Sequence, residues 1–125
     1  MQPSESLNDI DFGTWTGARF SDLADDPDWS DWNESRATNC PPGGESMQQA
    51  QARAVAFIQS LRTSHPRGTI VAVSHADIIK SVLLWCLELT LDAHVRFDID
   101  PASTSAIVLW DGGGKILWMN QGVTA

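Results

Sequence analysis

The sequence predicts an α/β domain, and three consecutive segments near its middle predict it. Residues 45–63 carry a stripe of alanine and larger apolar residues at steps of three and four, which indicates a helix with one apolar face. Residues 70–74 are apolar and β-branched without alternation, which is typical of a strand buried on both faces. From residue 76 the helical spacing of apolar residues returns. Helix, short turn, strand and helix in this order are typical of an α/β fold.

The other segments are shorter, and Gly and Pro residues separate them. The predicted elements are a loop over 7–17, a short helix over 20–24, turns with a short helix over 25–35, a half-exposed strand over 95–99, and a hairpin of strands 105–110 and 115–119. A strand rather than a helix follows the glycines of this hairpin, so the Gly-rich turn is not a phosphate-binding loop. We expect the whole chain, 1–125, to form one domain.

Composition limits the partners. The net charge is −8, which argues against binding to nucleic acid or to an anionic membrane. The longest apolar run, residues 81–89, contains Glu88 and is too short to span a bilayer. Two cysteines make no disulfide framework and favour a cytoplasmic setting. Because the three histidines lack ligand spacing and no Cys pair supports zinc, we expect no metal site.

His75 is the strongest candidate site residue, since it follows the predicted strand 70–74 and precedes the predicted helix. Open α/β sheets place ligands at this junction. The free amides of the first helical turn favour an anion there, and a histidine can bind phosphate or move a proton. The alternative interpretation is a buried or capping histidine that holds a turn.

Two acidic residues in the N-terminal loop could supply an acid. Asp9 and Asp11 lie two residues apart, so in an extended stretch their side chains share a face. The alternative is that both cap or turn the chain. In the segment 25–35, Trp29 and Trp32 are expected to be packing residues, although they could also face a ring-bearing ligand. The acidity of this segment should disfavour highly anionic substrates such as bisphosphates.

Four segments together resemble the histidine phosphatase superfamily, which includes the cofactor-dependent phosphoglycerate mutases and related phosphatases. They are the loop Leu-Asn-Asp-Ile-Asp-Phe-Gly-Thr-Trp-Thr-Gly at 7–17, Pro-Gly-Gly-Glu-Ser at 42–46, Val-Ser-His-Ala at 73–76, and the terminal hairpin ending at Asn120. The resemblance implies a mostly parallel sheet flanked by helices, with a C-terminal hairpin. It also implies phosphoryl transfer through a phosphohistidine. For this chain we expect no cofactor.

The resemblance assigns roles to residues of this chain. His75 matches the second histidine, which helps to hold the phosphoryl group, and the amide of Ala76 would bind a phosphoryl oxygen. Asp9 lies where many members carry the glutamate that protonates the leaving oxygen, although its side chain is one methylene shorter. Arg53 also matches the pattern, and we expect it to be a structural ion-pair partner.

The chain departs from the family in one respect. The Arg-His-Gly motif with the nucleophilic histidine is absent from these 125 residues, as is the segment that carries another pocket arginine. His65 and His94 fall in predicted turns away from the implied pocket. We therefore expect an N-terminally truncated domain with impaired activity as a phosphomonoester phosphatase or as a mutase-like isomerase.

The alternative is a non-catalytic domain, or pseudoenzyme, that binds a phosphorylated small molecule or forms a homo-oligomer. Without the family's first strand, residues 70–74 would have an unpaired edge. An apolar strand with such an edge can pair with another chain.

Overall fold

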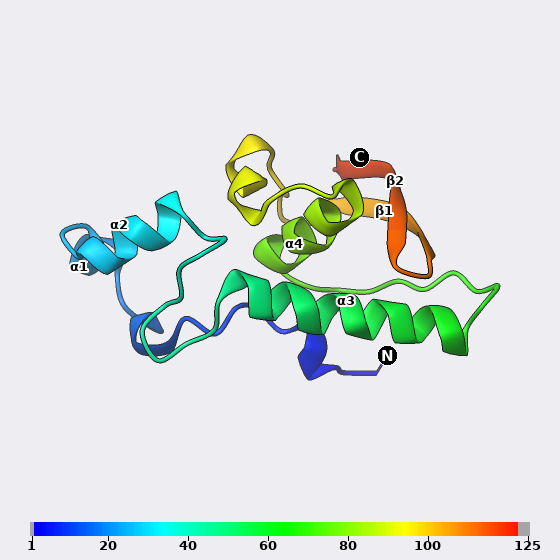
Figure 1. The fold of residues 1–125 in the computed structure, drawn as a ribbon, viewed down its shortest axis with the longest axis horizontal. Helices are drawn as coiled ribbons and strands as arrows, with labels where there is room; N and C mark the ends of the chain where they lie inside the picture. The colour runs from blue at the N-terminus through cyan, green and yellow to red at the C-terminus, as the bar shows by residue number, and fades with distance from the viewer. Residues whose placement is uncertain (1, 123–125) are drawn as a thin grey trace.

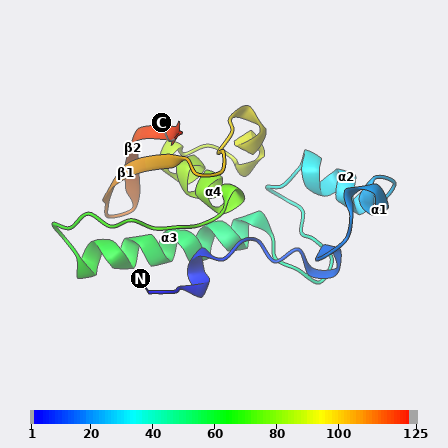
Figure 2. The ribbon, with the colours of Figure 1, turned by 180° about the vertical axis from the view of Figure 1, so that it is seen from behind.

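The computed structural model describes residues 2–122 and shows an α/β fold in which two helices and a hairpin form the main body (Figure 1). The helices are α1 (Phe20–Leu23), α2 (Pro27–Glu34), α3 (Met47–Ser64) and α4 (Ala76–Leu87), the 3-10 helices are η1 (Glu5–Leu7), η2 (Gly13–Trp15) and η3 (Leu91–Arg96), and the strands are β1 (Thr104–Trp110) and β2 (Gly113–Gln121). Helices α1 and α2 project at one end, away from the hairpin (Figure 2).

The two longest helices follow the sequence pattern closely. Helix α3 begins at a capping box, in which the Ser46 hydroxyl accepts from the Gln49 amide and the Gln49 side chain accepts from the Ser46 amide. Helix α4 ends at Leu87, and the capping residue Glu88 that follows has a left-handed backbone with φ of 58°. Helix α4 packs against both α3 and β2, so it is the central element of the body.

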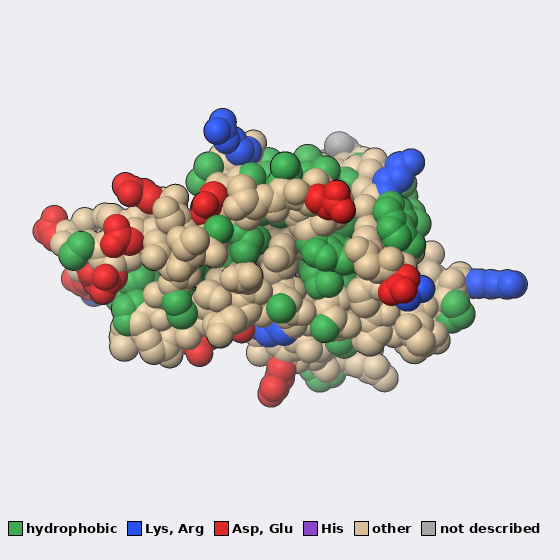
Figure 3. All heavy atoms as spheres, viewed as in Figure 1, with side chains coloured by type: hydrophobic (Ala, Val, Ile, Leu, Met, Phe, Trp, Pro, Cys, Tyr) green, Lys and Arg blue, Asp and Glu red, His purple; other side chains and the backbone are tan. Residues whose placement is uncertain are grey.

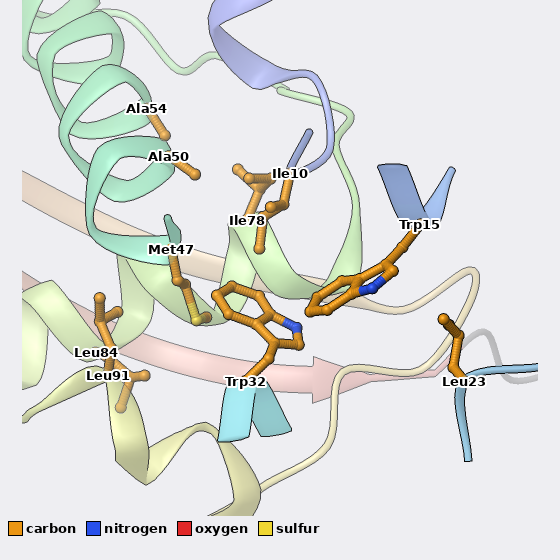
Figure 4. Close-up of a cluster of buried hydrophobic side chains, with 10 residues drawn as sticks. All are labelled: Ile10, Trp15, Leu23, Trp32, Met47, Ala50, Ala54, Ile78, Leu84 and Leu91. Atoms are coloured by element: carbon orange, nitrogen blue, oxygen red, sulfur yellow. The ribbon is translucent and has the colours of Figure 1, made fainter. Parts of the chain in front are cut away.

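The core lies where α3, α4 and η3 meet the N-terminal loop and α2 (Figure 4). Trp32 of α2 is fully buried, and so are Met47 and Ala50 at the start of α3. The ten residues of this cluster are Ile10, Trp15, Leu23, Trp32, Met47, Ala50, Ala54, Ile78, Leu84 and Leu91. Because the cluster draws on the N-terminal loop, the same packing that stabilises the domain also holds the loop that carries Asp9.

Two glycines allow the N-terminal loop to lie against the turn that precedes α3. Gly13 has φ of +58°, and a Cβ on either Gly13 or Gly44 would clash with the backbone of the other segment. The close approach lets the Thr14 amide donate to the Pro42 carbonyl at 3.0 Å and the Glu45 amide donate to the Asp11 carbonyl at 2.8 Å. The glycines of both motifs are therefore required by packing.

The largest difference between the predicted and the observed fold concerns the sheet. In the described residues the sheet has two antiparallel strands, β1 and β2, so the prediction of a mostly parallel sheet is wrong for this structure. Residues 69–73 are extended but form no backbone hydrogen bond with another described segment. Val71 is 88% exposed and Val73 is 75% exposed, so this segment is not buried on both faces as predicted. A strand needs a paired neighbour to be buried, and no described segment occupies that position.

Smaller differences concern the segment after α4. Residues 91–96 form the 3-10 helix η3, where a turn followed by a strand over 95–99 was expected. Alternation over such a short run cannot distinguish a strand from an irregular segment. The hairpin prediction is confirmed, with β1 and β2 extending one to two residues beyond the predicted bounds.

Candidate functional site

His75 lies immediately before α4, at the end of the extended segment. Its backbone is extended (φ −118°, ψ 157°), and its carbonyl accepts from the Ile79 amide at 2.9 Å. Its ring forms no capping bond to the helix and is exposed. Ala76 begins the helix, so the first-turn amides lie next to an imidazole that is accessible to a ligand. An amide cluster of this kind, with the helix dipole behind it, favours an anion.

A hydrogen bond joins the His75 segment to the N-terminal loop. The Ser74 hydroxyl donates to the Leu7 carbonyl at 2.8 Å, across 67 residues of sequence. Ser74 precedes His75 directly, and Leu7 precedes Asp9 by two residues. The structure therefore brings the two segments that carry the predicted catalytic residues together.

Arg53 of α3 fixes the backbone around Asp9. Its guanidinium donates to the Ser6 carbonyl at 2.8 Å and to the Asp9 carbonyl at 3.0 Å. It also forms a two-point ion pair with Glu45, at 2.8 and 2.9 Å. This pairing lowers the pKa of Glu45 and raises the pKa of Arg53. The expected role of Arg53 as a structural ion-pair partner is confirmed.

Each of the two loop carboxylates accepts a hydrogen bond from a nearby backbone amide. Asp9 Oδ1 accepts from the Ile10 amide at 2.8 Å, and Asp11 Oδ1 accepts from the Gly13 amide at 2.9 Å. Both therefore also shape the turn, as the alternative interpretation predicted. Both are exposed, and both line a groove of about 690 Å³. Each carboxylate consequently has access to a ligand in that groove.

An ion pair that the sequence pattern did not indicate closes one side of the same groove. Arg36 Nη1 donates to Asp77 Oδ1 at 2.9 Å, and Nη2 donates to Asn33 Oδ1 at 3.1 Å. The guanidinium carbon lies 5.1 Å from the ring centroid of Trp32, within the range of a cation–π contact. Asp77 lies two residues after His75, in the first turn of α4. This position is the one feature of the sequence that could have indicated its place beside the site.

The other two histidines lie elsewhere. His65 is exposed in the turn after α3, with its Nδ1 at 2.9 Å from the Ser64 hydroxyl oxygen. His94 is buried in η3, and burial followed by the charge of Arg36 lowers its pKa. Neither lines the groove, and the predicted site residues His75 and Ala76 are not among its lining residues either. Across residues 2–122 no cluster of three or more potential ligand side chains could hold a metal ion, and no helix has the length and apolarity to cross a membrane.

The fold and these motifs define a class of protein. The chain belongs to the histidine phosphatase superfamily (branch 1), whose family model matches residues 1–122. Among curated proteins, the chain is similar to the bifunctional protein Rv2228c of Mycobacterium tuberculosis, with 29% identity over 120 residues. The match covers 94% of this chain and 33% of that protein, so the chain spans about a third of the length of this relative.

Solved structures show the same fold. YhfR of Bacillus stearothermophilus superposes with a TM-score of 0.86 at 22% identity, covering 97% of this chain and 61% of that one. The mycobacterial glucosyl-3-phosphoglycerate phosphatase Rv2419c, in a complex with VO3, gives a TM-score of 0.80 at 25% identity and covers 95% and 64%. An alpha-ribazole phosphatase from Shigella flexneri gives 0.76 at 23%, covering 98% and 63%. The chain thus matches just over three fifths of each structure.

Proposed function

We propose that this chain carries the phosphoryl-binding part of a phosphomonoester phosphatase site. In this proposal the His75 ring and the Ala76 amide hold phosphoryl oxygens, and Asp9 gives a proton to the leaving oxygen. The observation that carries it is the exposed imidazole at the start of α4, next to the Ser74–Leu7 hydrogen bond that joins it to the Asp9 loop. Two free cysteines, Cys40 and Cys86, are consistent with a cytoplasmic setting.

Hydrolysis is preferred to a mutase-like isomerisation. Two of the structural relatives are named as an alpha-ribazole phosphatase and a glucosyl-3-phosphoglycerate phosphatase. His94 is buried in η3 and His65 lies in the turn after α3, so we propose neither as a nucleophile for a phosphorus held by His75. We therefore propose that residues 1–125 alone bind a phosphorylated small molecule and hydrolyse it slowly, since loss of a nucleophile removes several orders of magnitude of rate.

The first test replaces His75 with alanine and measures binding of inorganic phosphate by calorimetry. A charge-assisted hydrogen bond contributes about 1.5–3 kcal/mol, so we expect His75→Ala to weaken phosphate binding by about tenfold or more. His65→Ala is the matched control, because His65 is exposed in a turn outside the groove, and it should leave binding unchanged. Equal binding by the wild-type chain and His75→Ala would contradict the proposal.

A second candidate function is self-association through the unpaired segment 69–74. The specific observation is that, within residues 2–122, the backbone of this segment forms no hydrogen bond, while the side chains of Val71 and Val73 are exposed. Extended, apolar and uncharged backbone of this kind is a template for pairing with another strand.

The oligomeric state of residues 1–125 tests this candidate. We expect sedimentation equilibrium to show a concentration-dependent dimer, and Val71→Lys to make the chain monomeric, since an edge lysine opposes pairing. Gln48→Lys adds the same charge at an exposed position of α3 and should leave the dimer intact. An ordinary weak dimer has a dissociation constant of about 1 μM. A wild-type chain that stays monomeric at a protein concentration of about 100 μM would therefore eliminate the candidate.

A further inference from the structure

The groove beside Asp9 has an aromatic wall that the phosphoryl chemistry does not require. Its volume of about 690 Å³ is in the range of small-molecule sites. Trp15, Phe20 and Trp29 line it together with Asp9, Arg36 and Asp77. The groove therefore combines aromatic side chains with the carboxylate proposed as the proton donor.

The three aromatic rings form a continuous series from the core to the surface. Trp15 and Trp29 pack edge to face, with centroids 5.3 Å apart and an interplanar angle of 88°, and Phe20 lies 6.0 Å from Trp29. Trp15 is 7% exposed, whereas Phe20 is 79% exposed. An open ring at the rim, backed by two packed rings, offers a surface on which another flat apolar group can stack.

The charges around the groove disfavour a second anionic group. Three carboxylates, Asp9, Asp11 and Asp77, line it, against the single guanidinium of Arg36, which already pairs with Asp77. Acidic side chains also gather at the end of the molecule formed by α1 and α2 (Figure 3). An organic group bearing a carboxylate or a second phosphate would meet net negative charge, whereas a neutral group would not.

We infer that this groove binds the organic part of the phosphate ester and that this part is a neutral aromatic ring. The inference rests on the proposed function, because Asp77, which lines the groove, lies in the first turn of α4 two residues after His75. Trp29 and Phe20 are then specificity-determining residues. The sequence had left a choice between packing and ring binding for Trp29 and Trp32. In the structure Trp32 is fully buried in the core, and Trp29 lines the groove.

Calorimetry with four probes tests the inference: inorganic phosphate, 1-naphthyl phosphate, glycerol 3-phosphate and 3-phosphoglycerate. Stacking of one ring contributes about 1–3 kcal/mol, so 1-naphthyl phosphate should bind about tenfold more tightly than glycerol 3-phosphate. The additional carboxylate should make 3-phosphoglycerate the weakest ester. Phe20→Ala should reduce the preference for the naphthyl ester severalfold without changing phosphate binding.

The variants separate the outcomes. Trp29→Ala should abolish the preference, but Trp29 also packs against the core, so the exposed Phe20 provides the variant that keeps the fold. Trp118→Ala removes a half-exposed aromatic ring from β2. It should change neither the preference for the naphthyl ester nor the affinity for phosphate. If His75-dependent phosphate binding is present but the naphthyl ester has no advantage, or Phe20→Ala leaves it intact, the inference is overturned and the proposed function stands. If no probe binds, the proposed function fails and the inference with it.

Discussion

Trp32→Ala is expected to lower the free energy of unfolding by about 3–5 kcal/mol, the range for truncating a buried aromatic side chain. Trp32 is fully buried and belongs to the core cluster. Its ring meets that of Phe12 edge to face, with centroids 6.4 Å apart, and the Arg36 guanidinium covers it. The variant therefore leaves a cavity and also removes support from the ion pair beside the groove.

Urea unfolding monitored by circular dichroism measures this loss. Trp118→Ala is the matched control, because it deletes the same side chain at a half-exposed position, and its loss should be less than half as large. Trp32→Phe fills more of the cavity and should lower the free energy of unfolding by about 1–2 kcal/mol. This variant provides a measurement if the alanine variant does not fold. Equal losses for Trp32→Ala and Trp118→Ala would show that Trp32 is not a core residue.

The elements that the sequence predicted well are those set by local periodicity. The apolar stripe of residues 45–63 and the renewed spacing after residue 76 correspond to α3 and α4. Both patterns depend only on neighbours within one or two turns. The location of His75 at a helix start follows from the same local switch, and so it too could be predicted.

The features that could not be predicted depend on contacts between distant segments. The segment 70–74 has strand-like residues, but burial depends on a neighbouring strand that its own residues do not encode. The Arg36–Asp77 pair joins positions 41 residues apart, and the Ser74–Leu7 bond joins positions 67 apart. Only the folded chain shows that the first of these contacts lines the groove and that the second joins the His75 segment to the N-terminal loop.

Arg53→Met is expected to destabilise the domain by about 1.5–3 kcal/mol, the range for hydrogen bonds to charged groups. Methionine keeps much of the apolar stem but leaves the Glu45 carboxylate and the carbonyls of Ser6 and Asp9 without their donor. Hydrogen exchange of the Ile10 amide should accelerate, because the loop around Asp9 loses its attachment to α3. Arg53→Lys should recover only part of the stability, since an ammonium cannot reproduce the fork of the guanidinium.

The loss caused by Arg53→Met should also depend on pH. Arg53 lowers the pKa of Glu45 in the folded chain below its ordinary value of 4.5. The pair therefore contributes its full stabilisation above pH 4.5, and this contribution falls as the pH drops through the lowered pKa. The difference between the wild-type chain and Arg53→Met should shrink over that acidic range. Arg62→Met is the control, because its partner Asp111 lies 3.6 Å away with a side chain that is 96% exposed, and such surface pairs contribute little. A loss at neutral pH no larger than that of Arg62→Met would mean that Arg53 does not anchor the Asp9 loop.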